Sequence, residues 1–505
     1  MNPQIWILAA GRLLSQVGTG FTMFYAAIFF VNQVGVSATA VGIALSSQSI
    51  SGVLGRFWGG VGADSPRWGR KRILVLSAIF SALADGVLAA ADNLPLLLMG
   101  NLLMGWGAGL YWPATEAIVA DLTQDQQRNE AFALTRIADM VGLSLGIALA
   151  GQWIVWNGNY RWLFVMDGVS FVIFGGLIIL AIQETLPRDR PAQNIGSQWR
   201  RARQDQTLMF YCVVNVLFTG AIAQVQSTVP LYFTTFVTAG SITPIVLSHL
   251  ATFYIVLSAL LQWPIVRWLN RFSRWQTLML SMLVWSLSFA GVWLTGISSS
   301  GAIALAVLSF SLFALASVTY TPAASALVAE LAPEDLRGMY LALNSQCWAA
   351  GYFLGPLLGG WAMDQSLKIV HGVWLGGAGL MLVGWVALAQ IARREHQMQQ
   401  KMSVMVHQAA QACQHQDAAG FAALFTPDGE IQLPQQTIQG QAAIAQVTQA
   451  YLASCEAIAI EIQQVKTVGR DRLQVQWQWS EPHKQRLNQL EIYFQQGKIQ
   501  RWQEF

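Results

Sequence analysis

The chain has 505 residues, of which 54% are hydrophobic and 11% charged, and its formal net charge is +3. Soluble proteins carry about 25% charged residues, so this composition excludes an ordinary soluble protein. The small net charge argues against a nucleic-acid partner.

The N-terminal sequence MNPQIWILAA has no basic segment and no small-residue cleavage site. We therefore predict that it starts a retained helix and is not a signal peptide. The four cysteines form no metal-type pair and imply no disulfide framework, so we expect no metal site and no cofactor. They are Cys212, Cys347, Cys413 and Cys455.

Twelve apolar runs follow in chain order, each about long enough to cross the hydrocarbon core of a bilayer. They are 5–31, 38–62, 73–91, 94–119, 132–156, 160–182, 207–236, 243–268, 275–297, 301–329, 339–363 and 369–392. Six precede a polar loop at 183–206 and six follow it. We predict an all-α polytopic membrane protein of two six-helix pseudo-repeats, residues 1–182 and 207–395, embedded in the lipid bilayer.

Basic residues mark every second segment between these runs. These segments carry Arg67, Arg70, Lys71 and Arg72, then Arg128, Arg188, Arg190, Arg200, Arg201 and Arg203, then Arg267, Arg271, Arg274, Arg337, Arg393, Arg394 and Lys401. The opposite set carries only Arg161 and Lys368. Because Lys and Arg accumulate in cytoplasmic loops, we predict a multi-pass protein of the cell membrane with both termini cytoplasmic.

The fourth and fifth runs of the first half recur in the second half. At a constant offset of 209, residues 111–151 and 320–360 are identical at fifteen of forty-one positions. Internal repeats are the architecture of secondary transporters, whose substrate site lies between the halves. We therefore expect function at the interface between 1–182 and 207–395.

The segment after the second run reads GGVGADSPRWGRKR, residues 59–72. With the twelve-run arrangement it resembles the major facilitator superfamily, which carries G-x-x-x-D-R-x-G-R-R/K there; Ser65-Pro66 is an insertion. The resemblance implies alternating access and a cytoplasmic gate, and the alternative is that the arginines only set the topology. The expected coupling or gating residues are Asp64, Arg70, Lys71, Arg128 and Arg337.

Glycines four residues apart mark the fifth and eleventh runs. Gly351-x-x-x-Gly355-Pro356 resembles an antiporter-type pattern of the same family, although that pattern belongs in the fifth run, where Gly142 and Gly146 lack the proline. The alternative is close helix packing alone, because such glycines let two backbones approach.

Six charged residues fall inside the apolar runs, where a charge costs about 2.5–3.5 kcal/mol on insertion scales. Arg12, Glu116, Arg136 and Asp139 fall in the cytoplasmic half of the first, fourth and fifth runs. We predict a proton relay or cation site there, and the alternative is a static network that orients helices. Asp85 and Asp167 lie nearer the outer side, where a water-filled vestibule would accommodate them.

The second half has no Asp or Glu well inside a run, and it offers aromatic and amide side chains instead. Charges on one wall and aromatic rings on the other suit an amphipathic organic substrate, cations included. The candidate cavity residues are Gln224, Tyr254, Tyr320, Asn344 and Trp348.

After a polar linker at 396–401, residues 402–505 predict a small cytoplasmic α+β domain. A helix at 402–415 and another ending near Ala453 precede strand-like runs at 458–468, 473–480, 490–494 and 499–505. The phrases LFTPDGEI, IQGQAAIAQV and IYFQQGKIQRWQEF resemble the nuclear-transport-factor-type cone fold shared with ketosteroid isomerase and polyketide cyclases. Asp428, His483 and Glu491 are acid–base candidates; the alternative is a module for ligand binding or self-association.

Together these features predict a secondary transporter that moves a small organic solute by alternating access. It resembles drug-efflux members of the major facilitator superfamily, which implies proton-coupled export of amphipathic compounds and no enzymatic activity. The alternatives are uptake of a sugar or metabolite, a membrane sensor that transports nothing, and a tethered enzyme acting through residues 402–505.

Overall fold

The computed structural model describes residues 2–504 except 64, 66, 124, 186–194, 238–241, 334–335, 434–435, 456–457, 468–471, 482–483 and 496. Side chains at 125–129, 133, 195–198, 337–338, 467 and 484 also lie outside the description. Two compact units are present. Unit 1 is Met1–Arg201, Met209–Ser325 and Ala342–Ala387, and unit 2 is Ala202–Leu208, Ala326–Leu341 and Leu388–Phe505.

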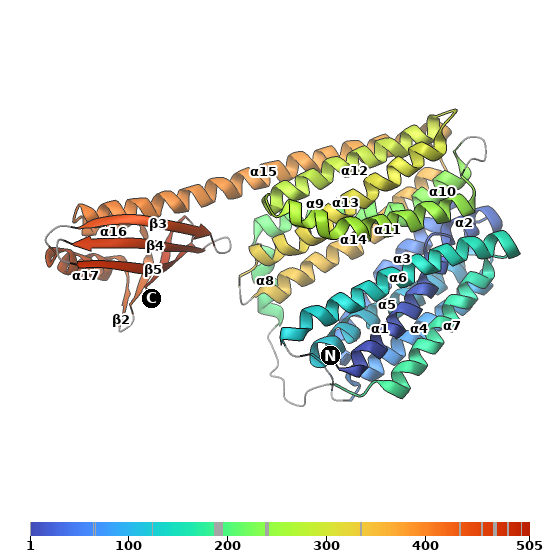
Figure 1. The fold of residues 1–505 in the computed structure, drawn as a ribbon, viewed down its shortest axis with the longest axis horizontal. Helices are drawn as coiled ribbons and strands as arrows, with labels where there is room; N and C mark the ends of the chain where they lie inside the picture. The colour runs from blue at the N-terminus through green and yellow to red at the C-terminus, as the bar shows by residue number, and fades with distance from the viewer. Residues whose placement is uncertain are drawn as a thin grey trace. The chain divides into compact units, whose positions relative to one another are not determined.

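The first half of unit 1 consists of long helices that lie together in Figure 1. They are α1 (Pro3–Met23), α2 (Ala26–Ile28), the π-helical turn η1 (Phe29–Gln33), α3 (Ala38–Ala63), α4 (Gly69–Ala90), α5 (Leu94–Asp121), α6 (Asp125–Asn157) and α7 (Arg161–Ala181). The first predicted run is therefore not one uniform helix, since it breaks at Phe24–Tyr25. The short helix α8 (Ile195–Gln204) lies in the predicted loop 183–206.

The second half repeats this pattern. Its helices are α9 (Gln206–Gln226), α10 (Thr228–Thr235), α11 (Pro244–Leu269), α12 (Arg274–Ile297), α13 (Ala302–Leu331), α14 (Arg337–Met363) and α15 (Leu367–Gln414). Eleven helices of the described chain are long and apolar enough to span a membrane. The eleventh predicted run, 339–363, falls on α14, which is not among these eleven helices and carries the polar sequence Asn344-Ser345-Gln346.

Local sequence explains where several helices begin. Asn2, Asn93 and Thr243 each cap a helix with the side-chain oxygen, and a proline occupies the first turn that follows. Proline fits there because its missing N–H has no partner inside the helix. Ser273 and Gln276 form a reciprocal capping box at the start of α12.

Two predictions about where helices begin and end are wrong. The polar linker expected at 396–401 is part of α15, which runs without a break from Leu367 to Gln414. Residues 393–401 have the sequence RREHQMQQK, which contains no Gly or Pro and favours a helix despite its polarity. The run predicted at 207–236 is divided at Ser227 into α9 and α10.

The tail within unit 2 is a mixed sheet of six strands covered by helices. The strands are β1 (Phe425–Leu433), β2 (Gln436–Gln439), β3 (Ala459–Thr467), β4 (Arg472–Glu481), β5 (Lys484–Gln495) and β6 (Lys498–Glu504), in the order β2-β1-β6-β5-β4-β3. Neighbouring strands pair antiparallel except β1 and β6, which pair in parallel. The period-two pattern of β4 buries Leu473, Val475, Trp477 and Trp479 as expected.

The core of the tail lies between this sheet and the helices α15, α16 (Ala418–Ala423) and α17 (Gln441–Ala453). Val406 and Ala409 of α15 join Phe421, Phe425 and Trp502 in one buried cluster. Trp477 lies 5.1 Å from Trp502 between ring centroids. Large aromatic rings therefore fill the space that the cone encloses at these residues.

Candidate functional site

An ion pair inside the first half joins two of the predicted intramembrane charges. The guanidinium of Arg12 on α1 donates to both carboxylate oxygens of Asp139 on α6, with Nε 3.0 Å from Oδ1. Arg12 is buried and its guanidinium carbon lies 5.7 Å from the ring centroid of Tyr111 and 5.6 Å from that of Trp112. A bidentate pair against aromatic faces holds the two charges in one geometry.

Glu116 and Arg136 differ in their relation to this pair. Glu116 on α5 is exposed in unit 1 and interacts electrostatically with Arg12 and with Arg56 of α3. Arg136 on α6 is also exposed, and no contact to the Arg12–Asp139 pair is described for it. The structure thus brings together Arg12, Asp139, Glu116 and Arg56, and Arg56 was not predicted as a member.

Close glycine contacts place α1 against α6 beside the ion pair. A Cβ at Gly142 would collide with the carbonyl oxygen of Leu13, and one at Gly146 would collide with that of Val17. On the same face of α1, the Cβ position of Gly20 lies 2.9 Å from the Cα of Gly146. The equivalent contacts in the second half are made by Gly351 and Gly355 against α9.

The candidate cavity residues of the second half divide into two layers. Tyr320 is fully buried, and its hydroxyl donates to Asn215 Oδ1 at 2.8 Å. Asn215 in turn donates to Asn344 Oδ1 at 2.8 Å, and Asn344 is also buried. These residues therefore support the wall rather than form its surface.

Three other side chains of this wall are partly exposed. Trp348 lies 6.2 Å from Tyr320 and 6.0 Å from Tyr352 between ring centroids. Gln224 donates to the carbonyl oxygen of Gly355 at 3.0 Å, and Tyr254 shares a hydrogen bond of 3.1 Å with Ser317. This set offers aromatic faces and amide groups without a formal charge.

At the predicted gate, Asp64 and the side chains of Arg128 and Arg337 lie outside the described residues. Arg70 is buried, forms an ion pair with Asp121 and donates to the carbonyl oxygen of Ala117 at 3.0 Å. Lys71 donates to the carbonyl oxygen of Ile179 at 2.8 Å. Both basic residues therefore bind within the first half in this conformation.

Sequence reasoning missed the acids that complete this region. Glu184 accepts from the backbone N–H groups of Arg70 at 3.0 Å and Lys71 at 3.2 Å, and so caps α4. Gly69 makes this possible, because its φ of +70° turns the chain into α4 beside the Glu184 carboxylate. Asp121 and Glu184 each follow an apolar run directly, which is the sequence signal that was available.

The described contacts between the two halves lie on one side of unit 1, named here the 34–37 side after the turn between η1 and α3. Asp364, at the end of α14, accepts from the N–H groups of Ala38 at 3.0 Å and Thr39 at 2.7 Å. Ser46 donates to the carbonyl oxygen of Phe353 at 2.6 Å. Ser248 of α11 donates to the carbonyl oxygen of Ile147 of α6 at 2.9 Å. The halves are thus closed against each other on this side.

Pro356 also belongs to this contact. A Cβ at Gly42 of α3 would collide with the carbonyl oxygen of Pro356, and one at Gly360 would collide with that of Ala38. The helices α3 and α14 approach closely here because glycine occupies both positions. The proline-containing segment thus lies at the interface between the halves.

Asp85 and Asp167 do not face an outer vestibule in this structure, so that expectation is wrong for this conformation. Their exposed fractions are 0% and 1%. The reason is that α4 and α7 pack against each other along the side chains of both acids.

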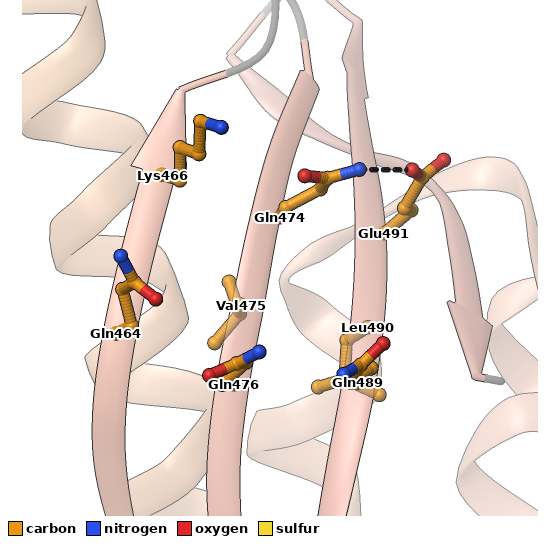
Figure 2. A pocket seen from close by; sticks show the side chains of 8 residues that line it. All are labelled: Gln464, Lys466, Gln474, Val475, Gln476, Gln489, Leu490 and Glu491. Carbon is orange, nitrogen blue, oxygen red and sulfur yellow. Dashed lines mark hydrogen bonds between the residues drawn. The ribbon is translucent and has the colours of Figure 1, made fainter.

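The tail has a polar hollow of about 440 Å³ on its sheet, lined by Gln464, Lys466, Gln474, Val475, Gln476, Gln489, Leu490 and Glu491 (Figure 2). Gln474 donates to Glu491 at 2.6 Å, and the Tyr493 hydroxyl donates to it at 2.9 Å. Burial alone would raise the pKa of Glu491, but these hydrogen bonds and the charge of Arg472 lower it below its usual range. Glu491 is therefore an ionised acceptor.

The other two acid–base candidates of the tail do not join Glu491 in the hollow. Asp428 is exposed on β1, and His483 lies outside the described residues. The polar side chains of the hollow belong to the strand positions that alternate with the core residues, so the hollow lies on the outer face of the sheet.

Two family models match the chain. The Major Facilitator Superfamily model matches residues 8–240 and 225–427, and a SnoaL-like domain model matches residues 406–502. The first covers well over half of the chain, and the second coincides with the sheet-containing tail.

Individual proteins agree with these matches. Multidrug resistance protein MdtH of Escherichia coli O157:H7 (strain EC4115 / EHEC) is 30% identical over 349 residues, covering 68% of this chain and 82% of MdtH. The MFS-type transporter YqjV of Bacillus subtilis (strain 168) is 26% identical over 371 residues, covering 72% of this chain and 87% of YqjV.

Solved structures share the fold at lower identity. The nucleoside transporter NupG has a TM-score of 0.65 at 17% identity, over 77% of this chain and 99% of NupG. A D-xylose–proton symporter has a TM-score of 0.60 at 17% identity, over 77% of this chain and 96% of the symporter. These likenesses show the helical membrane fold over about three quarters of the chain.

Proposed function

The chain belongs to the major facilitator superfamily of secondary transporters, and we propose that this member exports amphipathic organic compounds, cations among them, in exchange for protons. The observation that carries the proposal is the Arg12–Asp139 ion pair of the first half, with the exposed Glu116 within electrostatic reach of Arg12. The second half offers aromatic and amide side chains instead of charges. The 30% identity to a multidrug resistance protein supports the export of several compounds.

The charges suggest how exchange would work. Arg12 is held by Asp139, while Glu116 is exposed and lies within electrostatic reach of Arg12 and Arg56. A proton or a cationic substrate can each neutralise the Glu116 carboxylate, so binding of one disfavours binding of the other. Such competition at one carboxylate is sufficient for proton-for-cation exchange.

The second half supplies the other part of the binding surface. Trp348 and Tyr352 present ring faces that attract a cationic or planar apolar group. Gln224 and Gln226 add amides that orient a polar substituent without a charge of their own. Adaptable contacts of this kind suit a range of amphipathic compounds better than one sugar or metabolite.

The closed 34–37 side supports alternating access as the mechanism. With the Lys/Arg bias placing both termini in the cytoplasm of a cell membrane, that side would be the outer one. The described conformation would then have its outer gate closed, with Asp364 holding α3 and α14 together.

The test is flux of the fluorescent cation ethidium in proteoliposomes under an imposed pH gradient. We expect gradient-driven flux from the wild-type chain and its loss in Asp139→Asn and Glu116→Gln. Ethidium binding should be retained in Asp139→Asn and weakened in Glu116→Gln, which lacks the carboxylate that the cation neutralises. Asp92→Asn is the matched control, because Asp92 is an exposed acid that accepts a hydrogen bond from Asn93 of its own turn. Wild-type flux in both test variants would contradict the proposal.

The tail is proposed to bind a ligand or a second copy of the chain rather than to catalyse a reaction, because aromatic rings fill its core. A variant that ends after Lys401 separates these roles. We expect it to retain gradient-driven ethidium flux; loss of flux in a stable truncated protein would favour a function located in the tail.

A further inference from the structure

Two acids inside the first half lie apart from the Arg12–Asp139 pair. Asp85 is on α4 and Asp167 is on α7, and both lie nearer the 34–37 side of these helices than the opposite side. The Cβ position of Gly168 lies 3.2 Å from the Cβ of Asp85, so α7 packs directly on that residue. The two carboxylates are close enough to interact electrostatically.

The polar groups around this acid pair leave most of its oxygens without partners. The Thr22 hydroxyl of α1 donates to Asp167 Oδ2 at 3.0 Å. By distance and angle, neither oxygen of Asp85 nor Asp167 Oδ1 has a hydrogen-bond partner among the described residues, and the Ser170 hydroxyl lies close to the Asp167 carboxylate. Ser170 is only 5% exposed, and a Cβ at Gly18 would collide with both its Oγ and Asp167 Oδ1. Asp167 Oδ1 and Ser170 Oγ therefore lie together beside Gly18 of α1.

No cation in the described part of the chain neutralises the pair, because the charges on the surrounding helices are held elsewhere. On α1, Arg12 binds Asp139. On α5, Asp121 binds Arg70, and Glu116 is near Arg12 and Arg56.

The charged and polar groups nearer the acid pair also have other partners. On α7, Arg161 donates to the carbonyl oxygen of Ala89 at 2.6 Å and lies over the Phe29 ring. Beyond α4, Asp92 contacts Asn93, and the rings of Tyr25 and Tyr160 pair at 6.5 Å.

Two adjacent buried carboxylates with no counter-ion cannot both remain ionised. A buried carboxylate without a partner pays a large desolvation cost, and a second negative charge at the same place adds repulsion. A shared proton removes both costs, as in other pairs of carboxyl groups that occupy one site. The pair therefore holds a proton in the conformation described here.

We propose that Asp85, Asp167 and Ser170, with Thr22, form a proton-binding site that is occluded inside the first half and is distinct from the Arg12–Asp139–Glu116 group. The role of this site in coupling rests on the proposed function of proton-driven transport. Its chemistry is a simple exchange, in which one carboxyl group releases a proton to water when the site opens and regains it before the site closes.

The path from this site to the interface between the halves is short. Thr22 is two residues before the break in α1 at Phe24–Tyr25. The Tyr25 hydroxyl donates to the carbonyl oxygen of Ile147 at 3.4 Å, and the Ser248 hydroxyl of the second half donates to the same oxygen. A segment that binds the acid pair at one end thus touches the closed gate at the other, which links proton release to opening of the 34–37 side.

Infrared spectroscopy of the full-length protein in detergent tests proton binding directly. At pH 7 we expect a protonated-carboxyl C=O band that shifts in deuterated water, changes in frequency in Asp85→Asn and in Asp167→Asn, and is lost in the double variant Asp85→Asn/Asp167→Asn. Asp139→Asn is the matched control, and it should leave the band unchanged because Asp139 is ionised against Arg12. Asp85→Glu, which keeps a carboxyl group, should retain the band at a shifted frequency.

The proposal is overturned if the band persists unchanged in the double Asn variant, or if sodium chloride abolishes it and so identifies a sodium site. Coupling is measured on the same preparations as ethidium flux under a pH gradient, which should fall in both Asn variants to that of protein-free liposomes. Full flux without the band would show a static acid pair and contradict the coupling role. If the wild-type chain moves no ethidium, the proposed function fails while the band still decides whether the site binds a proton.

Discussion

Replacing Asp364 with alanine should weaken the closed 34–37 side. Its carboxylate accepts from two backbone N–H groups at the start of α3, at 3.0 and 2.7 Å, although it belongs to the other half of the molecule. Loss of a capping carboxylate at a helix N-terminus costs about 1 kcal/mol. Because this cap exists only while the halves touch, the ratio of closed to open molecules should fall roughly 5-fold.

Pulsed electron paramagnetic resonance measures this shift as a change in distance distribution. Spin labels at Gln33 and Lys368, both exposed and in different halves, would be introduced after the four native cysteines are replaced by alanine. We expect a larger long-distance population in Asp364→Ala than in the parent protein or in Asp92→Ala. Identical distributions in all three proteins would refute the idea that Asp364 holds the gate closed.

Three further outcomes follow from individual contacts. Gly146→Ala should lower the thermal unfolding temperature, with overpacking costing about 1–3 kcal/mol, whereas Gly86→Ala, which has open space around it, should not. Asp121→Ala should destabilise the protein by about 3–5 kcal/mol, because it leaves the buried Arg70 charge without its carboxylate; an unfolding temperature equal to that of Asp92→Ala would argue against this. Burial raises the pKa of the Cys413 thiol to about 12, so its reactive thiolate is scarce below that pH. Mass spectrometry after iodoacetamide treatment at pH 8 should find Cys413 unmodified in folded protein and alkylated in detergent-denatured protein, and rapid modification of the folded form would show that the core of the tail is open.

The overall fold could be predicted from the sequence because its signals are local. Runs of about twenty apolar residues and the basic segments between them indicate spans and pseudo-repeats without any knowledge of packing. The same holds for the alternating pattern of β4, where one face is buried. The predicted linker at 396–401 was wrong because polarity was taken as a break, although helix propensity persists there.

The candidate site could be predicted only in part. The pairing of Arg12 with Asp139 joins residues 127 positions apart, and their presence in apolar runs drew attention to both. Asp364 and Glu184 act on helix N-termini that lie 326 and 114 positions away, and no local pattern marks such partners. Asp85 and Asp167 were expected to face water, but a sequence does not tell which face of a helix is covered by its neighbours.

The most direct test of proton-coupled export is the response of ethidium flux to the sign of the pH gradient. Proteoliposomes containing the full chain would be prepared with the interior either more acidic or more alkaline than the medium. We predict that ethidium moves toward the acidic compartment in both cases, that a protonophore abolishes this movement, and that it ceases in Asp139→Asn. Movement at the same rate and in the same direction under both gradients would contradict the account.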